Sequence, residues 1–273
     1  MKLFGDYHLH SNFSRDGRAT IIEMVRAAKD KGMQEIAITE HGFGAWYNGM
    51  RKKNFEKWQG DIESARADMP VLMGIEANLV SHSGKIDIDD EDSKKFDIVL
   101  FGVHLAVLYS VRAFFFFFVP NMFWKLVRWT PKGRKRKNTQ AVINAIENNR
   151  IDVWVHPNRY FRLNVIEVAE VCAKRGTLLE LNSKKISFRP IDFERMIRVG
   201  AKFIINSDAH NTSRIGETAR VEEFLKNCDY NEDDIINLKK TFTEYKKKND
   251  NNNAGRNQEQ NPEQKQRRWG RRG

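Results

Sequence analysis

The stretch GDYHLHSNFSRDGRATIIEMVRAAKDKGMQEIAITEH, residues 5–41, holds the pattern that decides the fold. Short apolar runs at Gly5–His8 and Glu35–Thr39 predict two buried strands. Between them, Thr20–Lys31 has the apolar spacing of an amphipathic helix. Thr20 stands at the expected N-cap, and Gly32 follows the helix where a left-handed residue is needed. A strand, a helix and a strand in this order indicate a unit of a parallel sheet.

The same alternation continues along the chain. Five further strands are predicted at Val71–Ile75, Ile98–Val103, Val153–Val155, Leu178–Leu181 and Phe203–Asn206. Five further helices are predicted at Phe55–Arg66, Thr139–Asn148, Asn164–Arg175, Ile191–Val199 and Glu217–Asn227, with Asn164 as an N-cap and Gly176 and Gly200 as stops. Seven strands with intervening helices predict an α/β fold. We expect a distorted seven-stranded (β/α) barrel, close to the TIM type but one strand short.

Length and composition favour one large globular domain. The chain has 273 residues and 40% hydrophobic residues, which fits a folded core rather than disorder. No apolar run follows Lys2, so no secretory signal is expected. Cys172 and Cys228 have neither metal-ligand spacing nor a disulfide pattern, which predicts free thiols and a cytoplasmic protein. The barrel domain is assigned to residues 1–245.

A segment at about residues 105–138 breaks the alternation and is interpreted as an insertion in a loop of the barrel. It holds the aromatic stretch Leu105–Val127, with five phenylalanines at Phe114–Phe118, and then the basic run Trp129–Lys137. A transmembrane span is excluded, because candidate ligands before and after the insertion lie at the same barrel face. A lid, an oligomer contact, an interfacial membrane patch and a buried packing helix remain open, with packing or oligomer contact favoured.

The second unusual segment is the end of the chain. Residues 246–273 contain nine lysines and arginines and three acids, so they contribute +6 to the net charge of +11. Their polar composition, with almost no apolar residue, predicts a disordered tail. The favoured interpretation is a solvated end. The alternative is contact with nucleic acid, to which the tail, the basic run and Trp269 would contribute.

Six of the seven histidines follow directly on predicted strands. They are His8, His10, His41, His104, His156 and His210. Because the carboxyl ends of barrel strands meet at one mouth, we expect these side chains to lie together. Three carboxylates occupy similar places: Glu76 ends a strand, Asp208 precedes His210 by two residues, and Asp16 follows His10 by six. The seventh histidine, His82, stands in a polar loop and is expected at the surface.

This residue set predicts a metal cluster. Imidazole and carboxylate together suit zinc, manganese or iron, and nine ligands are too many for a single ion. Two or three bridged divalent ions are therefore expected. His8 and His10 share one side of an extended segment and can hold one ion together. For any single histidine a hydrogen-bonding role is the commoner explanation, but six equivalent positions favour the cluster.

The motifs HLHSNFSRDG, TEHG, GIEAN, GVH, VHP and NSDAH follow one another in this order. Together they resemble the PHP (polymerase and histidinol phosphatase) family, from about Gly5 to Gly216. The resemblance implies a seven-stranded barrel with two or three metals at its mouth, phosphoester hydrolysis, and the nine ligands named above. It also favours Glu76 as a bridging carboxylate and Asp208 as a ligand that orients the attacking water. Some relatives have histidine where this chain has Asp16, so metal preference could differ.

Four arginines beside the expected mouth are candidates for holding a substrate phosphate, because guanidinium pairs with phosphate in a forked geometry. They are Arg189, Arg159, Arg15 and Arg214, with Arg189 favoured first and Arg159 second. The alternative for each is a surface arginine with an acidic neighbour. Asn182 either bonds a ligand group or holds the backbone.

Three functions remain open at this point. The favoured one is hydrolysis of a phosphate monoester, as in a histidinol phosphatase, which makes a phosphorylated small molecule the expected partner. The second is a nuclease or a nucleic-acid end-processing phosphoesterase, favoured by the basic tail and basic run. The third is a non-catalytic scaffold stabilised by metal, which the complete ligand set disfavours. Removal of the tail would weaken the second function and leave the first unchanged.

Overall fold

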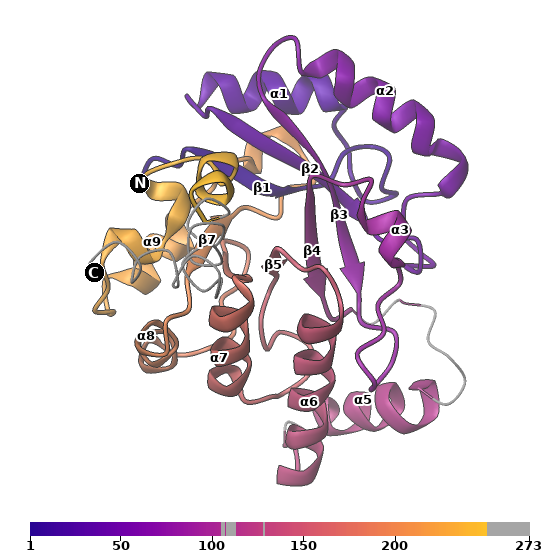
Figure 1. Ribbon diagram of the computed structural model, residues 1–273, viewed down its shortest axis with the longest axis vertical. Helices are drawn as coiled ribbons and strands as arrows, with labels where there is room; N and C mark the ends of the chain where they lie inside the picture. The colour runs from indigo at the N-terminus through magenta and orange to yellow at the C-terminus, as the bar shows by residue number, and fades with distance from the viewer. Residues whose placement is uncertain (105–106, 108–112, 128, 250–273) are drawn as a thin grey trace, which may run out of the picture.

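The computed structural model describes residues 1–104, 107, 113–127 and 129–249. Its seven strands form one parallel sheet in which spatial order equals chain order. They are β1 (Gly5–Leu9), β2 (Glu35–His41), β3 (Val71–Asn78), β4 (Ile98–Gly102), β5 (Val153–Trp154), β6 (Leu178–Asn182) and β7 (Phe203–Asn206). A bridge between Leu9 and Ala209 brings the two edges together, so the sheet is a nearly closed barrel (Figure 1). The predicted fold is confirmed.

Helices surround the strands. The α-helices are α1 (Ile21–Asp30), α2 (Phe55–Ala65), α3 (Asp90–Ser93), α5 (Val119–Leu126), α6 (Lys132–Asn148), α7 (Val165–Arg175), α8 (Pro190–Arg198) and α9 (Ala219–Leu225). Shorter turns are the π-helical η2 (Phe114–Phe118) and the 3-10 turns η1 (Lys52–Asn54), η3 (Thr212–Arg214), η4 (Glu232–Asp234) and η5 (Ile236–Leu238). Helices α1 and α2 lie side by side near β1 and β2, whereas α6, α7 and α8 follow one another on the other side (Figure 1).

Local sequence signals explain most helix ends. Thr20 forms the predicted capping box with Glu23 at the start of α1. Gly32, Gly176 and Gly200 all have positive φ, as predicted for the residues that end helices. Asn164 is the N-cap residue of α7, as predicted, but its side chain makes no capping hydrogen bond.

The amino end of the barrel is closed by an apolar floor. Buried side chains from the strands, among them Tyr7, Leu100 and Ile204, pack there with Ile236 and Phe242 from the end of the described chain. The hydroxyl of Tyr7 accepts a hydrogen bond of 2.8 Å from the backbone N–H of Phe242. This floor leaves the carboxyl ends of the strands as the mouth.

The seam between β1 and β7 is fastened by side chains. Asn237 is fully buried, and its Nδ2 donates to the carbonyl oxygens of Gly5 (2.9 Å) and Ile205 (2.7 Å). Its Oδ1 accepts from the N–H of Ile205 at 3.0 Å, and Asp6 Oδ1 accepts from the N–H of Ser207 at 3.1 Å. Side-chain amide and carboxylate groups therefore satisfy backbone groups that a full ladder would pair.

The insertion differs from its prediction in one respect. Its basic run does not form a loop, because α6 begins at Lys132, one residue after Pro131. Lysine and arginine are good helix formers, and proline favours the first turn of a helix, so local propensity explains the longer helix. Ala113 and Phe117 are buried, which agrees in part with the packing interpretation.

The described chain ends in a further helix at residues 242–249. Lys246 at its centre forms an ion pair of 2.5 Å with Asp152. The predicted domain boundary at residue 245 therefore falls within a helix, and the remainder of the predicted tail, 250–273, lies outside the described residues. No helix in the described part of the chain is long and apolar enough to cross a bilayer.

Candidate metal centre

All nine predicted ligands meet at the mouth of the barrel. Each is within 4 Å of at least one other ligand, and they are His8, His10, Asp16, His41, Glu76, His104, His156, Asp208 and His210. Strand ends position most of them: β1 carries His8, β2 ends with His41, and β3 contains Glu76. His82, predicted at the surface, is exposed.

Glu76 is the centre of the cluster. Its Oε1 lies 2.8 Å from His156 Nε2, 3.2 Å from His104 Nε2 and 3.4 Å from His8 Nε2. Its Oε2 lies 2.7 Å from His41 Nδ1. Burial opposes the charge of Glu76, but the surrounding imidazoles hold its pKa well below the usual range. An ionised carboxylate in this position can bridge several cations.

The other two carboxylates also lie close to histidine ligands. Asp208 Oδ1 lies 3.9 Å from His8 Nε2 and 3.8 Å from His10 Nε2. Asp16 Oδ2 lies 3.3 Å from His41 Nε2 and 3.4 Å from His210 Nε2. His8, His10 and His41 lie closer to Glu76 than to either aspartate, so the ligands form one continuous cluster around Glu76.

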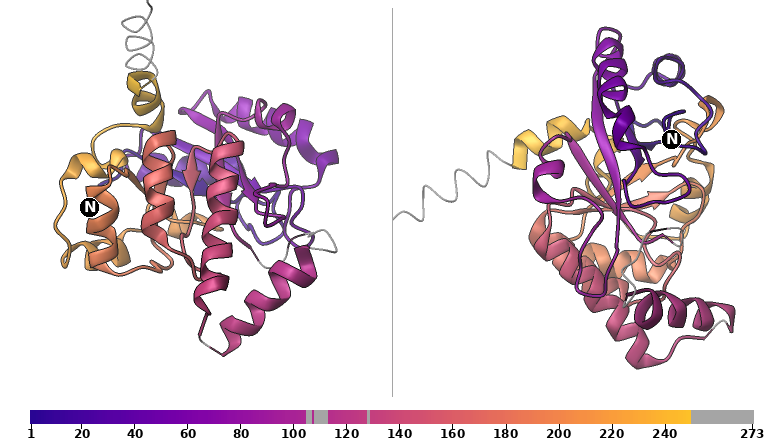
Figure 2. Two further views of the ribbon diagram at one scale, coloured as in Figure 1. Left: turned by 60° about the horizontal axis from the view of Figure 1, so that its bottom comes forward. Right: turned by 90° about the vertical axis from the view of Figure 1, so that its right-hand side faces the viewer.

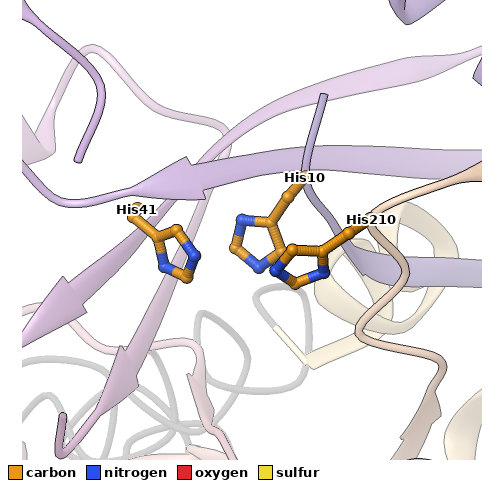
Figure 3. Close-up of side chains that lie close together, drawn as sticks. All are labelled: His10, His41 and His210. Carbon is orange, nitrogen blue, oxygen red and sulfur yellow. The ribbon is translucent and has the colours of Figure 1, made fainter. Parts of the chain in front are cut away.

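Figure 3 shows three of the imidazoles, which come from separate elements and converge. His10 follows β1, His41 ends β2 and His210 follows β7. The ring centroid of His10 lies 4.0 Å from that of His41 and 4.4 Å from that of His210. Each ring offers a nitrogen within 4.8 Å of the others, a spacing that suits a shared cation.

Unpaired buried atoms show that the residues fit metal ions. His8 Nε2, both ring nitrogens of His10 and His41 Nε2 are buried and have no hydrogen-bond partner among the described residues. Buried polar atoms are almost always satisfied, and leaving several together without partners is costly. Nitrogen and carboxylate oxygen are ligands of divalent transition metals, which would satisfy these atoms. The chain therefore has a site for divalent metal.

The second ring nitrogen of several ligands is held in place. His8 Nδ1 lies 2.7 Å from Glu180 Oε1, and His104 Nδ1 lies 2.6 Å from Asn78 Oδ1. Glu180 also accepts from the backbone N–H of His156 at 2.7 Å. Such partners set the tautomer and orientation of metal-ligating histidines. The sequence analysis missed Glu180, although a carboxylate inside a predicted buried strand was a signal for it.

Burial and neighbouring charges act in opposite directions on the pKa values of the ligands. Burial opposes the charged form of His8 and His41, but adjacent carboxylates raise the pKa of His8 well above its usual value and that of His41 to about 10. Burial and neighbouring imidazoles lower the pKa of His10. Burial also opposes charge on Asp16 and Asp208, yet their cationic neighbours lower both pKa values. Metal binding to this site must displace protons.

The backbone is unusual at two ligands. His156 and Asp208 have φ values of 33° and 52°, in the left-handed region that residues with a Cβ rarely adopt. Such conformations cluster at functional sites and persist only when the surroundings enforce them. Gly102 is required for a different reason, since a Cβ there would lie 2.8 Å from His156 and 2.9 Å from His104.

The loop from His10 to Asp16 is held by a buried carboxylate that is not a ligand. Glu40 accepts hydrogen bonds from the hydroxyls of Ser11 and Ser14 and from the N–H of Ser11 at 3.0 Å. Gly17 fits only because it has no side chain, since a Cβ would lie 1.9 Å from the carbonyl oxygen of Ser11. Glu40 in the TEHG motif therefore positions Asp16 through this loop.

Two cationic side chains form ion pairs with the ligand Asp208. Arg159 Nη1 lies 3.5 Å from Asp208 Oδ2, and Lys184 Nζ lies 2.9 Å from Asp208 Oδ1. Arg159 was a predicted substrate-binding residue, whereas Lys184 was missed because a surface lysine in a loop has no distinguishing pattern. Asn182 donates to Asp208 Oδ2 at 3.2 Å and to Glu180 at 2.9 Å, so it holds carboxylates in place.

Among the described residues, the other three arginines form no ion pair with the ligands. Arg189 is exposed and pairs with Asp192 at 3.0 Å at the start of α8, so its leading rank among substrate arginines gains no support. Arg15 lies over the ring of Tyr47 at 4.6 Å. Arg214 lines a cavity of about 820 Å³ together with Lys184, and its buried Nε has no hydrogen-bond partner.

Comparison with known proteins agrees with the geometry. The family model described as the PHP domain matches residues 6–184, which is more than half of the chain. This chain belongs to the PHP family. Its PHP relatives include a “Probable phosphatase” of Thermoanaerobacter sp. (strain X514), 29% identical over 252 residues, covering 87% of this chain and 91% of the relative. A “Probable phosphatase” of Shewanella sediminis is 25% identical, with 87% and 90% covered.

Solved structures share the PHP fold. The histidinol phosphate phosphatase of Lactococcus lactis, solved with zinc, L-histidinol and phosphate, matches with a TM-score of 0.57 at 17% identity, covering 84% of this chain and 95% of that one. A second match, from Listeria monocytogenes, has a TM-score of 0.52 at 15% identity, with 78% and 97% covered. Family and ligand set together identify an enzyme, a metal-dependent phosphatase.

Proposed function

We propose that this enzyme hydrolyses phosphate monoesters with three divalent ions at its mouth. The supporting observation is that the nine ligands converge around Glu76, because nine are more than a single ion can take. His8 and His10 with Asp208 would hold one ion, and Glu76 would bridge it to a second. His104 and His156 complete the second set. The remaining set would hold the third ion and consists of Asp16, His41 and His210.

Bound divalent ions supply an activated water at neutral pH and neutralise the charge of a phosphoryl group. The side chains of the protein provide the rest of the site. Arg159 and Lys184 place positive charge beside Asp208, at the edge of the ligand set, where phosphoryl oxygens would be held. Asp208 is fixed by both cations and by Asn182, so it can orient the attacking water.

A cavity next to this edge supports a small phosphorylated substrate. It has a volume of about 460 Å³ and contains Lys125, Arg159, Arg162 and Lys185, while no acidic residue of the described chain lines it. Tyr160 forms the wall towards the metals, with its ring 5.7 Å from that of His104. The pKa of Lys125 is lowered by partial burial and by its cationic neighbours. The cavity therefore favours an anionic or neutral leaving group over a cation such as histidinol.

The test compares substrates and variants of the purified protein supplied with Mn²⁺ or Zn²⁺. We expect turnover of p-nitrophenyl phosphate and of monoesters with anionic leaving groups, and weak turnover of histidinol phosphate. Glu76→Gln and Asp208→Asn should each lower kcat/KM at least about a hundred-fold. The control is His82→Ala, which changes the one histidine outside the cluster.

Each outcome discriminates among functions. Cleavage of a labelled single-stranded oligonucleotide in preference to the monoesters would support the nuclease alternative. Metal binding without any hydrolysis would support the scaffold. Faster turnover of histidinol phosphate than of anionic monoesters would keep the phosphatase but contradict the proposed role of the cationic cavity.

A further inference from the structure

Helix α5 and the turn before it expose an unusual number of large apolar side chains. Phe115, Phe116, Phe123 and Leu126 have exposed fractions of 60%, 69%, 54% and 82%, and Trp129 just after the helix is 61% exposed. The first four follow the helical repeat along one side. Apolar residues gathered in this way on a surface mark a site of interaction.

The opposite side of the same helix is firmly anchored. Phe117 is 2% exposed and packs edge-on against Phe161 with ring centroids 5.4 Å apart. Asn121 and Asn138 exchange two buried hydrogen bonds of 2.9 and 2.7 Å, which join α5 to α6. The exposed side is therefore a defined face of a packed helix.

Basic side chains border this face. Lys132, Lys135, Arg136 and Lys137 in the first turns of α6 are all exposed. No aspartate or glutamate occurs anywhere from residue 98 to residue 146. Helix α5 and the start of α6 form a V at one end of the molecule that extends beyond the barrel (Figure 2). The apolar and the basic side chains thus lie on neighbouring parts of one projection.

A cavity between the two arms combines both kinds of side chain. It has a volume of about 470 Å³, with Phe116 and Phe117 on the side of η2 and with Arg134 and Lys137 on the side of α6. Arg134 Nη1 donates to the carbonyl oxygen of Phe116 at 2.9 Å, which fixes the two sides relative to each other. An amphiphile with an anionic headgroup matches these walls.

We propose that this projection docks on the surface of an anionic phospholipid bilayer. The docking face consists of Phe115, Phe116, Phe123 and Leu126 with the basic residues at 132–137. Aromatic and aliphatic side chains enter the boundary between headgroups and acyl chains, while lysine and arginine contact the anionic headgroups. A second copy of the chain fits less well, because a symmetric contact would place this acid-free basic surface against itself.

Docking would also orient the enzyme. Lys125, in the last turn of α5, lies 5.0 Å from the ring of Tyr160, which stands between the cationic cavity and two metal ligands. The docking face and the metal mouth are therefore close neighbours. The inference does not depend on the identity of the substrate.

The test is co-sedimentation of the full chain with vesicles of phosphatidylcholine alone and of phosphatidylcholine with phosphatidylglycerol. We expect binding to the anionic vesicles only. Phe115→Ser with Phe116→Ser should lower the bound fraction at least ten-fold, and Lys132→Glu with Arg136→Glu should do the same. Exposed residues elsewhere provide matched controls, Ile191→Ser and Lys53→Glu, which should bind as the unchanged chain does.

Hydrolysis of p-nitrophenyl phosphate by every variant reports that the barrel is folded. If the variant with Phe115→Ser and Phe116→Ser binds vesicles as well as the unchanged chain does, the proposal is overturned. Vesicle binding would then come from basic residues elsewhere, including the basic end of the chain. The proposal is also overturned if the unchanged chain binds no vesicles but forms a dimer in solution that the same variant dissociates. The exposed face would then be a contact between two copies of the chain.

Discussion

Glu180 determines how two of the metal-ligating histidines are presented. Its carboxylate bonds His8 Nδ1 and the N–H of His156, and it also accepts from Asn182 and Asn206. In Glu180→Gln the amide occupies the same volume but carries no charge. His8 Nδ1 then loses its bond to a carboxylate, so His8 Nε2 is a weaker ligand for metal. We expect metal affinity to fall roughly 10- to 100-fold, as changes of such supporting groups typically do.

Titration of the metal-free protein with Zn²⁺ measures this loss. Glu167→Gln in the first turn of α7 is the matched control and should bind Zn²⁺ unchanged. Unaltered affinity in Glu180→Gln would mean that the orientation of His8 comes from packing alone.

Residues differ in how far sequence predicts them. His41 and His104 stand at the ends of apolar runs, so chain topology alone brings them to one mouth. The place of Glu180 inside a buried strand is a local signal, but its partner His8 lies 172 positions away in sequence, so no local pattern predicts its role. Arg189 was favoured as a substrate-binding residue because it follows a strand end. Asp192, however, is only three residues away in sequence and forms an ion pair with Arg189.

At the scale of elements, one fully buried side chain, that of Asn237, makes three of the hydrogen bonds at the seam between β1 and β7. Asn237→Ala would leave the N–H and carbonyl of Ile205 and the carbonyl of Gly5 buried without these partners. We expect the free energy of unfolding to fall by about 3 kcal/mol, the cost of several unsatisfied buried groups. Urea unfolding followed by circular dichroism measures it. Asn227→Ala on the surface should change stability by less than about 0.5 kcal/mol.

Most of the seven strands were predictable because they are short apolar runs bounded by polar residues, as expected for a sheet buried on both faces, whereas β1 contains Asp6 and His8. Helix α6 was predicted to begin at Thr139, seven residues too late. The basic run suggested a loop because its like charges repel, yet Pro131 and the high helix propensity of lysine and arginine determine the start. Sequence patterns do not show which of two opposed local effects is stronger.

For the whole molecule, metal and stability should be linked. Ions that bind only the folded barrel stabilise it, by about 2.7 kcal/mol when their concentration is a hundred times Kd. Removal of metal with a chelator should therefore lower the midpoint of thermal unfolding by roughly 5–10 °C. Differential scanning calorimetry measures the shift. In Glu76→Gln the chelator should have little effect on the midpoint of thermal unfolding. If the midpoint falls as much as in the unchanged protein, the stabilising metal is bound elsewhere.

The order of the strands has a consequence for how the enzyme is made. Neighbouring strands are consecutive in the chain, except at the seam, where β1 meets β7. His8 and His10 leave the ribosome early in translation, whereas Asp208 and His210 leave it only when the barrel is almost complete. A nascent chain that ends before β7 therefore carries seven of the nine ligands but lacks Asp208 and His210. The ligand set is complete only after β7 and Asp208 have been synthesised, so a chain released before β7 would have no complete catalytic centre.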